Sequence, residues 1–260
     1  MRYFKKSLGQ NFLIDRNIIK KIINLVDIKN KDIIEIGPGQ GALTDEILRK
    51  NPKSLSIIEK DSFLFKKLSL KYANNNKIKI FHSDILKFDI EKVVKKDTNI
   101  FGNLPYNISS QILIKFIKLK KWPPKFKNVI FMFQKELGEK ILGNFSSNNY
   151  GRLSIISNYR LNPISKFLVS PNCFFPKPKV NSLVIHFQPK DKNQNIKDIN
   201  NLEKITNLLF SSKRKIIKKK IEKILSYSEI KKIRDLKLNQ RPSEIKPEAY
   251  YKITELFEKG

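Results

Sequence analysis

From residue 15 to residue 142, short apolar runs alternate with longer stretches in which apolar residues recur every three or four positions. The runs are rich in β-branched and aromatic residues and predict strands at 32–36, 54–58, 78–82, 98–102 and 127–133. The stretches predict helices at 15–26, 42–50, 62–72, 107–119 and 135–142. This alternation is typical of a parallel sheet covered by helices, so the predicted fold class is α/β.

Beyond residue 142 the alternation stops. Two further strands are expected at 164–169 and 181–188, joined by the loop SPNCFFPKPK, whose prolines confine it to the edge or surface of the sheet. Residues 152–161 fit a helix and a strand equally well. These segments complete a first domain predicted to span residues 1–188.

A second, all-helical domain is expected at 200–260. The preceding stretch, QPKDKNQNIKDIN at 188–200, has almost no core-forming residues and is interpreted as a linker. Helical spacing follows at 202–210, 213–225 and 247–258, and Pro247 suits the first turn of the last of these helices.

The charge of the chain points to a polyanionic partner. The 260 residues carry a formal net charge of +29, and 40% of them are hydrophobic, enough for a real core. Such a surface binds nucleic acid by releasing the counterions condensed on its phosphates. A compositional drift of the whole genome toward lysine is the alternative explanation of part of this excess.

The remaining composition excludes several classes of protein. A single cysteine, Cys173, rules out an internal disulfide, and the two histidines form no zinc-like cluster with it, so we expect no metal and a reducing compartment. The start MRYFKK is followed by the polar SLGQNF where a signal peptide would be apolar. We therefore expect a cytoplasmic protein without a membrane segment.

A glycine-rich turn follows the first predicted strand of the sheet. Gly37, Gly39 and Gly41 stand between this strand and a helix, where bare backbone can approach a ligand at a helix N-terminus. This arrangement is typical of nucleotide pockets, although the same glycines can mark nothing more than a tight turn.

Two acids end the next two strands. Glu59 can accept hydrogen bonds from both hydroxyls of a ribose, and Asp84 can accept one from an adenine amine or can simply cap the segment after it. Because NAD-dependent oxidoreductases use a similar turn and acid, these residues do not decide between nicotinamide and S-adenosylmethionine.

The fourth strand ends in GNLPY, which resembles the signature of adenine-N6 methyltransferases. The lone pair of the adenine amine is delocalised into the ring, so acceptors must draw the amine out of conjugation and aim it at a methyl donor. Asn103, through its side-chain oxygen, and Leu104, through its carbonyl, can accept the two N–H groups, while Pro105 stiffens the turn and Tyr106 stacks on the base. A plain strand-to-helix turn is the alternative.

Most of the chain resembles the ribosomal RNA small-subunit adenine dimethyltransferase family. The motifs that carry this resemblance are LGQNFL at 8–13, EIGPGQGALT at 35–44, the acids Glu59 and Asp84, GNLPYNIS at 102–109, FMFQKE at 131–136, YGRLS at 150–154 and FFPKPKV at 174–180. The resemblance implies a Rossmann-like fold, S-adenosylmethionine as cofactor, and dimethylation of two neighbouring adenosines in a hairpin near the 3′ end of the RNA. It also implies an immature small ribosomal subunit as partner, and we expect a monomer.

The resemblance assigns roles to residues that no local pattern singles out. Asn11 and Leu13 of the N-terminal tail are expected to fold over the cofactor, and Phe174 is expected to face Tyr106 across the adenine. The other cofactor contacts that it implies are Gly37, Glu59, Asp84 and Asn103, with Gly39 in the same turn.

The family also holds RNA with its C-terminal helices, which fits the run SSKRKIIKKKIEK at 211–223. We expect RNA phosphates to be contacted by Lys213, Arg214, Lys215, Lys218 and Lys219. The buried side of this helix is expected to consist of Ile216, Ile217, Ile221, Ile224 and Leu225. A solvated basic face is the alternative, and Lys213 stands where the family pattern has an arginine, which removes a bidentate phosphate contact there.

Two other functions share parts of these motifs. Methyltransferases that confer antibiotic resistance modify an adenine of large-subunit RNA and have the glycine, acid and NLPY-type motifs, but the LGQNFL opening argues against them. A ribosome-assembly factor, in which binding matters more than chemistry, is the other alternative. Because the catalytic motifs are intact, the sequence favours a working enzyme.

Overall fold

A computed structural model describes residues 10–191 and 195–260. The start MRYFKK and the first two residues of the LGQNFL motif lie outside this part of the chain. The chain forms two compact units. The first comprises the chain up to Phe116 with Pro123–Gly138 and Asn162–Pro189, and the second comprises Ile117–Trp122, Glu139–Leu161 and Lys190–Gly260.

The first unit is built on a seven-stranded sheet in the order β4-β3-β2-β5-β6-β9-β7. Its strands are β2 (Asp32–Ile36), β3 (Ser54–Glu59), β4 (Ile78–His82), β5 (Thr98–Asn103), β6 (Phe126–Gln134), β7 (Leu161–Val169) and β9 (Ser182–Pro189). The strands from β4 to β6 run parallel, and β9 is antiparallel to β6. The five predicted parallel strands and the two closing strands are therefore confirmed.

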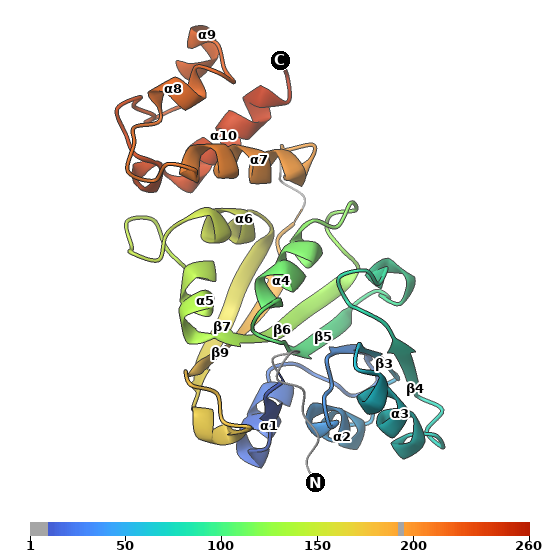
Figure 1. The fold of residues 1–260 in the computed structure, drawn as a ribbon. Coiled ribbons are helices and arrows are strands. Elements are labelled where there is room, and N and C mark those ends of the chain that lie inside the picture. Colours follow the sequence, from blue (N-terminus) through green and yellow to red (C-terminus); the bar gives the residue numbers. More distant parts are fainter. Residues whose placement is uncertain (1–9, 192–194) are drawn as a thin grey trace. The chain divides into compact units, whose positions relative to one another are not determined.

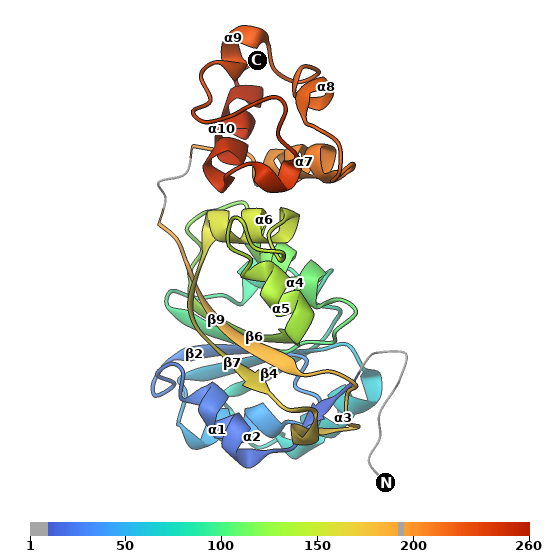
Figure 2. The ribbon, with the colours of Figure 1, turned by 90° about the vertical axis from the view of Figure 1, so that its left-hand side faces the viewer.

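Helices cover this sheet on both faces (Figures 1 and 2). On one face lie α1 (Arg16–Ile23), α2 (Ala42–Arg49) and α3 (Ser62–Lys71), and α4 (Ser109–Ile117) lies on the other. The side chains of Asp15 and Asp61 cap α1 and α3 by accepting hydrogen bonds from backbone amides of their first turns. Apolar residues of α1 and α2 pack against the sheet in one buried core that includes Ile23, Ile47 and Phe101.

A second, two-stranded sheet ties the N-terminal tail to the Pro-rich loop. Strand β1 (Phe12–Leu13) pairs antiparallel with β8 (Phe174–Phe175), so that Leu13 faces Phe174 in the register. The 3₁₀ turn η3 (Pro171–Cys173) precedes β8, and a further one, η2 (Ile90–Lys92), lies between β4 and β5. This pairing fixes the tail beside the ends of the main sheet.

The second unit is helical. It contains α6 (Arg152–Arg160), α7 (Ile199–Phe210), α8 (Lys218–Ile221), α9 (Tyr227–Ile230), the 3₁₀ turn η4 (Pro242–Glu244) and α10 (Pro247–Phe257), and α5 (Lys135–Ile141) crosses the boundary between the units. Its core joins α7 to α10, where the rings of Phe210 and Tyr250 stack with 5.8 Å between their centroids. The segment 152–161, which fitted either type of element, is a helix through Arg160.

The second unit is not contiguous in sequence, unlike the domain expected at 200–260. Helix α6 belongs to it because polar groups tie this part of the chain to the C-terminal helices. The Tyr150 hydroxyl donates to the Ile245 carbonyl at 2.8 Å, and the Tyr251 hydroxyl donates to the Ile155 carbonyl at 3.1 Å. Such side-chain bonds across some 95 residues leave no local pattern in the sequence.

The prediction of a helix at 213–225 is wrong for most of this segment, because only Lys218–Ile221 is helical within it. The amide of Ile217 donates to the carbonyl of Gln240 at 2.9 Å, and the amide of Lys218 donates to that of Leu238 at 3.2 Å. The backbone here therefore pairs with a later segment. Of the expected buried side, Ile217, Ile221 and Leu225 are buried, Ile224 is partly buried, and Ile216 is 50% exposed.

Two features of the described residues bear on function. No helix within 10–191 or 195–260 is long and apolar enough to span a bilayer. Within the same ranges, no three His, Cys, Asp or Glu residues gather as metal ligands would.

Candidate functional site

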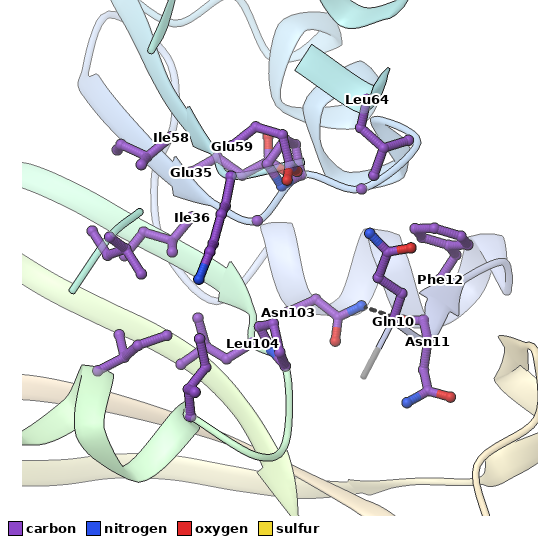
Figure 3. A pocket seen from close by; sticks show the side chains of 18 of the residues that line it. Gln10, Asn11, Phe12, Glu35, Ile36, Ile58, Glu59, Leu64, Asn103 and Leu104 are labelled. Atoms are coloured by element: carbon purple, nitrogen blue, oxygen red, sulfur yellow. Dashed lines mark hydrogen bonds between the residues drawn. The ribbon is translucent and has the colours of Figure 1, made fainter. Parts of the chain in front are cut away.

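A cavity of about 220 Å³ opens at the carboxyl ends of the parallel strands in the first unit (Figure 3). Parallel neighbours end at the same edge of a sheet, so loops far apart in sequence meet there. The predicted site residues that line the cavity are Asn11, Leu13, Gly37, Gly39, Glu59, Asp84, Asn103, Leu104, Pro105 and Tyr106. One edge of the fold thus brings together almost every site residue expected in this unit.

The turn after β2 gives the cavity a wall of bare backbone. Gly37 and Gly39 have φ angles of +63° and +60°, a region that residues with a side chain rarely adopt. A Cβ on Gly39 would lie 2.7 Å from the Cδ1 atom of Phe12. The glycine is therefore required by its conformation and by its approach to the tail.

Glu59 ends β3 and is 6% exposed. Its Oε1 accepts a hydrogen bond from the Asp61 amide at 2.7 Å. Burial raises the pKa of this carboxyl, and the backbone amides of Asp61, Gly39 and Lys60 act in the opposite direction. The side chain is held by the backbone of its own turn and by the glycine turn beside it.

Asp84 follows β4, and both of its oxygens are engaged. Oδ1 accepts from the Leu86 amide at 2.9 Å, while Oδ2 pairs with the Lys60 ammonium at 2.8 Å. The hydrogen bond with Lys60 is the largest influence on the pKa of Asp84, which lies below its usual value. Asp84 therefore serves as a local cap and also faces the cavity as an ionised acceptor.

Asn103, at the end of β5, is oriented by the N-terminal tail. Its Nδ2 donates to the backbone carbonyl of Asn11 at 2.9 Å (Figure 3). With the amide nitrogen committed to this bond, the oxygen of the same group is left to accept from a ligand. Leu104, next in the turn, is buried, so the backbone that carries its carbonyl is anchored.

The side chain of Tyr106 is held in place by a hydrogen bond at its hydroxyl group. Its hydroxyl shares a hydrogen bond of 2.6 Å with Ser182 Oγ at the start of β9, and burial raises the pKa of the phenol. The ring is thus held at the cavity in one orientation, as a stacking surface requires.

Phe174 does not line this cavity. It is 3% exposed and belongs to the core cluster that also holds Leu13 and Val169. Because side chains alternate along a strand, β8 turns Phe174 toward the core, and Phe175, which is 38% exposed, points the other way. The structure does not bring Phe174 to face the cavity, and its stacking role stays a prediction.

Some polar residues of the cavity were not identified from the sequence as site residues, among them Gln10, Glu35 and Lys60. The sequence did contain an indication that Glu35 belongs to the site. It is an acid within the otherwise apolar end of a central strand, and it stands two residues before the first glycine of the turn. For Lys60 the sequence contained no such indication beyond its position next to Glu59.

The five basic residues predicted to contact RNA lie in the second unit. Lys213, Arg214, Lys215, Lys218 and Lys219 are all exposed. Within the described part of the chain, none of them is in an ion pair with an acid. Their charges are therefore open to a polyanion.

Comparison with known proteins identifies the family of the chain. The family model for ribosomal RNA adenine dimethylase matches residues 1–259. A relative named ribosomal RNA small subunit methyltransferase A, from Pelagibacter ubique, is 43% identical over 98% of this chain and 97% of its own length. A protein of the same name from Wolbachia is 36% identical over 95% of this chain and 90% of its own.

Solved structures show the same fold. A dimethyladenosine transferase from Plasmodium falciparum superposes with a TM-score of 0.73 at 26% identity, covering 95% of this chain and 98% of its own. A 23S rRNA methyltransferase superposes with a TM-score of 0.70, covering 95% and 100%, and at 21% identity it shows the fold alone. The Rossmann-like methyltransferase fold is therefore confirmed, and the chain belongs to the ribosomal RNA adenine dimethylase family.

Proposed function

We propose that the cavity binds S-adenosylmethionine and that the protein dimethylates the N6 amine of adenines in small-subunit ribosomal RNA. The main support for this proposal is that the glycine turn, Glu59, Asp84 and the NLPY turn all line one cavity. The names of the 43% and 36% identical relatives favour the small subunit over the large-subunit alternative.

The residues of the cavity fit this cofactor. Glu59 is placed to accept from two ribose hydroxyls and Asp84 to accept from an adenine amine, while the backbone at Gly37 and Gly39 leaves room for close approach. Asn11 and Leu13 close the cavity from the tail, which the β1–β8 pairing holds in place. When bound, the cofactor supplies a sulfonium-activated methyl group.

The NLPY turn aims the target amine. The oxygen of Asn103 and the carbonyl of Leu104 accept the two N–H groups and localise the lone pair on nitrogen, while Tyr106 stacks on the base. No acid–base pair is needed before attack, and the proton of the product leaves to water. The chain contributes position and oriented hydrogen bonds.

Changing Glu59 to Ala should weaken binding of S-adenosylhomocysteine by roughly 1–3 kcal/mol, through loss of charge-assisted hydrogen bonds. Calorimetric titration measures this directly. Glu59→Gln is the matched control, because it keeps the shape and one acceptor and should lose less. Tight binding of NADH by the wild-type protein, with no binding of the methyl-donor analogue, would contradict the assigned cofactor.

Two variants of Tyr106 separate stacking from its hydrogen bond. Tyr106→Ala should weaken binding of the unstacked adenine by roughly 1–3 kcal/mol. Tyr106→Phe loses only the bond to Ser182 and should retain much of the activity. The Michaelis constant for unmodified subunits, measured for both variants, checks this. Equal losses in the two variants would mean that the phenol, and not the ring, is what matters.

The resemblance and the charge extend the proposal beyond the cavity. We propose that Phe174 faces Tyr106 once the target base is bound, that residues 1–188 form the catalytic domain, and that the helical domain at 200–260 contacts RNA. The substrate is proposed to be two neighbouring adenosines in a hairpin near the 3′ end of the RNA, presented by an immature subunit. A monomer acting in the cytoplasm is part of the same proposal.

A further inference from the structure

The second unit contains a cavity of its own, which shares no lining residue with the cavity of the first unit. It lies between Phe145, on the loop that joins α5 to α6, and the segment from Arg234 to Ala249. Its volume of about 440 Å³ is large enough for a ligand of nucleotide size. The proposed transfer mechanism makes no use of this cavity.

An aromatic ring forms one wall of this second cavity. Phe145 is 37% exposed, and its ring packs edge-on against Tyr150 with 5.5 Å between the centroids. The Tyr150 hydroxyl donates to the carbonyl of Ile245, which lies on the other side of the cavity. The ring is therefore braced by the segment opposite it, while part of its surface stays open. Such a ring offers a stacking surface to a flat ligand.

Of the two cations that line the cavity, one is paired and one is not. The Lys246 ammonium pairs with Asp235 Oδ2 at 3.1 Å. The Arg234 side chain is exposed, and it makes no hydrogen bond or ion pair within residues 10–191 and 195–260. Its guanidinium is left to bind an anionic group such as a phosphate.

The two glutamates of the cavity differ in the same way. Glu244 Oε2 accepts from the Arg241 amide at 2.7 Å. Glu248, at the start of α10, is exposed and makes no side-chain hydrogen bond or ion pair in the described part of the chain. A carboxylate repels phosphates, but it accepts hydrogen bonds from the exocyclic amine of a base. The cavity thus offers partners to a base as well as to its phosphate.

We propose that this cavity binds one unpaired nucleotide of the RNA. The base stacks on Phe145, its exocyclic amine donates to Glu248, and its phosphate pairs with Arg234. This inference rests on the proposed function, because it needs RNA as the partner of the helical domain. It goes beyond the basic residues at 213–219, since contacts to phosphates carry no information about the base. A lysine-rich protein segment fits less well, because Arg234 would repel its cations.

Two single-stranded RNAs test the base contact. Oligonucleotides of about eight cytidines or about eight uridines have rings of equal size, but cytosine carries an amine where uracil carries a carbonyl. Measured by fluorescence anisotropy, the wild-type protein should bind the cytidine strand about fivefold more tightly. Glu248→Gln should remove this preference, because its amide can accept from the amine or donate to the carbonyl.

The stacking contact is tested with both strands. Phe145→Ala should weaken binding of each by about tenfold. It removes no charge, so the slope of log affinity against log salt should stay unchanged. Tyr227→Ala is the matched control, because Tyr227 is an aromatic residue of the same unit that is 69% exposed and does not line the cavity. Its affinities should equal those of the wild-type protein.

The outcomes separate this inference from the proposed function. If the wild-type protein binds both strands equally, or Phe145→Ala binds them as tightly as the wild type, the nucleotide site is overturned. It is also overturned if binding of a lysine-rich peptide, and not of either strand, depends on Phe145. In each case binding of unmodified small-subunit RNA leaves the proposed function standing. If the wild-type protein binds neither strand and no small-subunit RNA, the proposed function itself is contradicted.

Discussion

Replacing Asn103 by alanine should lower the single-turnover rate of methyl transfer by about 10²–10³ while leaving the fold intact. The structure gives two reasons. The Asn103 amide is held by its hydrogen bond to the Asn11 carbonyl, so its oxygen is oriented before the substrate arrives. The variant removes that acceptor and also frees the tail. Because Asn103 lies at the end of its strand and is only partly buried, stability should change by about 1 kcal/mol.

The neighbouring Asn107 provides a control for this loss. It lies in the same turn and lines the same cavity, but it is exposed. Asn107→Ala should therefore change the rate far less. Rates measured on saturating unmodified subunits report the chemical step and not RNA binding. A wild-type rate for Asn103→Ala would show that the NLPY turn does not aim the amine, and would favour the assembly-factor interpretation.

Neutralising three of the basic residues Lys213, Arg214, Lys215, Lys218 and Lys219 should reduce RNA affinity by about 10²–10³ at 0.1 M salt. Each lost phosphate contact removes about 0.7–0.9 from the slope of log affinity against log salt, so the slope should fall by roughly two to three. Binding of S-adenosylhomocysteine should stay unchanged, since these residues do not line the cavity. Filter binding over a salt series measures both quantities.

The control for this prediction removes the same charge elsewhere. Lys29, Lys31 and Lys50 are exposed and precede the amino ends of β2 and β3, at the edge of the sheet opposite the cavity. If their triple neutralisation flattened the salt dependence as much as the C-terminal one, the excess of lysine would act as a general charge. The C-terminal residues would then be no more than a solvated basic face.

The sequence predicted most of the first unit because its signals are local. The apolar run at 98–102, for example, needs no distant contact to be recognised as a buried strand, and it forms β5. Parallel strands also bring their carboxyl ends to one edge. Gly37, Glu59, Asp84 and Asn103 each end or follow one of the predicted parallel strands, which explains why they lie together, while their joint role as cofactor contacts was implied by the family resemblance.

The features that were not predicted correctly depend on contacts between residues that lie far apart in the sequence. The basic run at 213–225 has helical spacing, yet its backbone pairs with residues 238–240, which no local pattern records. The same holds for α6, which polar bonds place in the second unit. The pairing of Leu13 with Phe174, which turns Phe174 toward the core, is another contact between distant segments that no local pattern records, and the stacking role of Phe174 stays a prediction. Glu35 was not identified as a cavity residue because the sequence around an acid in a central strand does not show what the side chain faces.

Transfer of labelled methyl groups from S-adenosylmethionine tests the central claim most directly. Unmodified small and large ribosomal subunits are offered separately to the protein, and the RNA is then digested to nucleosides. We expect label in dimethyladenosine from small-subunit RNA alone, and its loss with Asn103→Ala. Dimethyladenosine found only in large-subunit RNA, or no labelled adenosine in either subunit, would contradict the account.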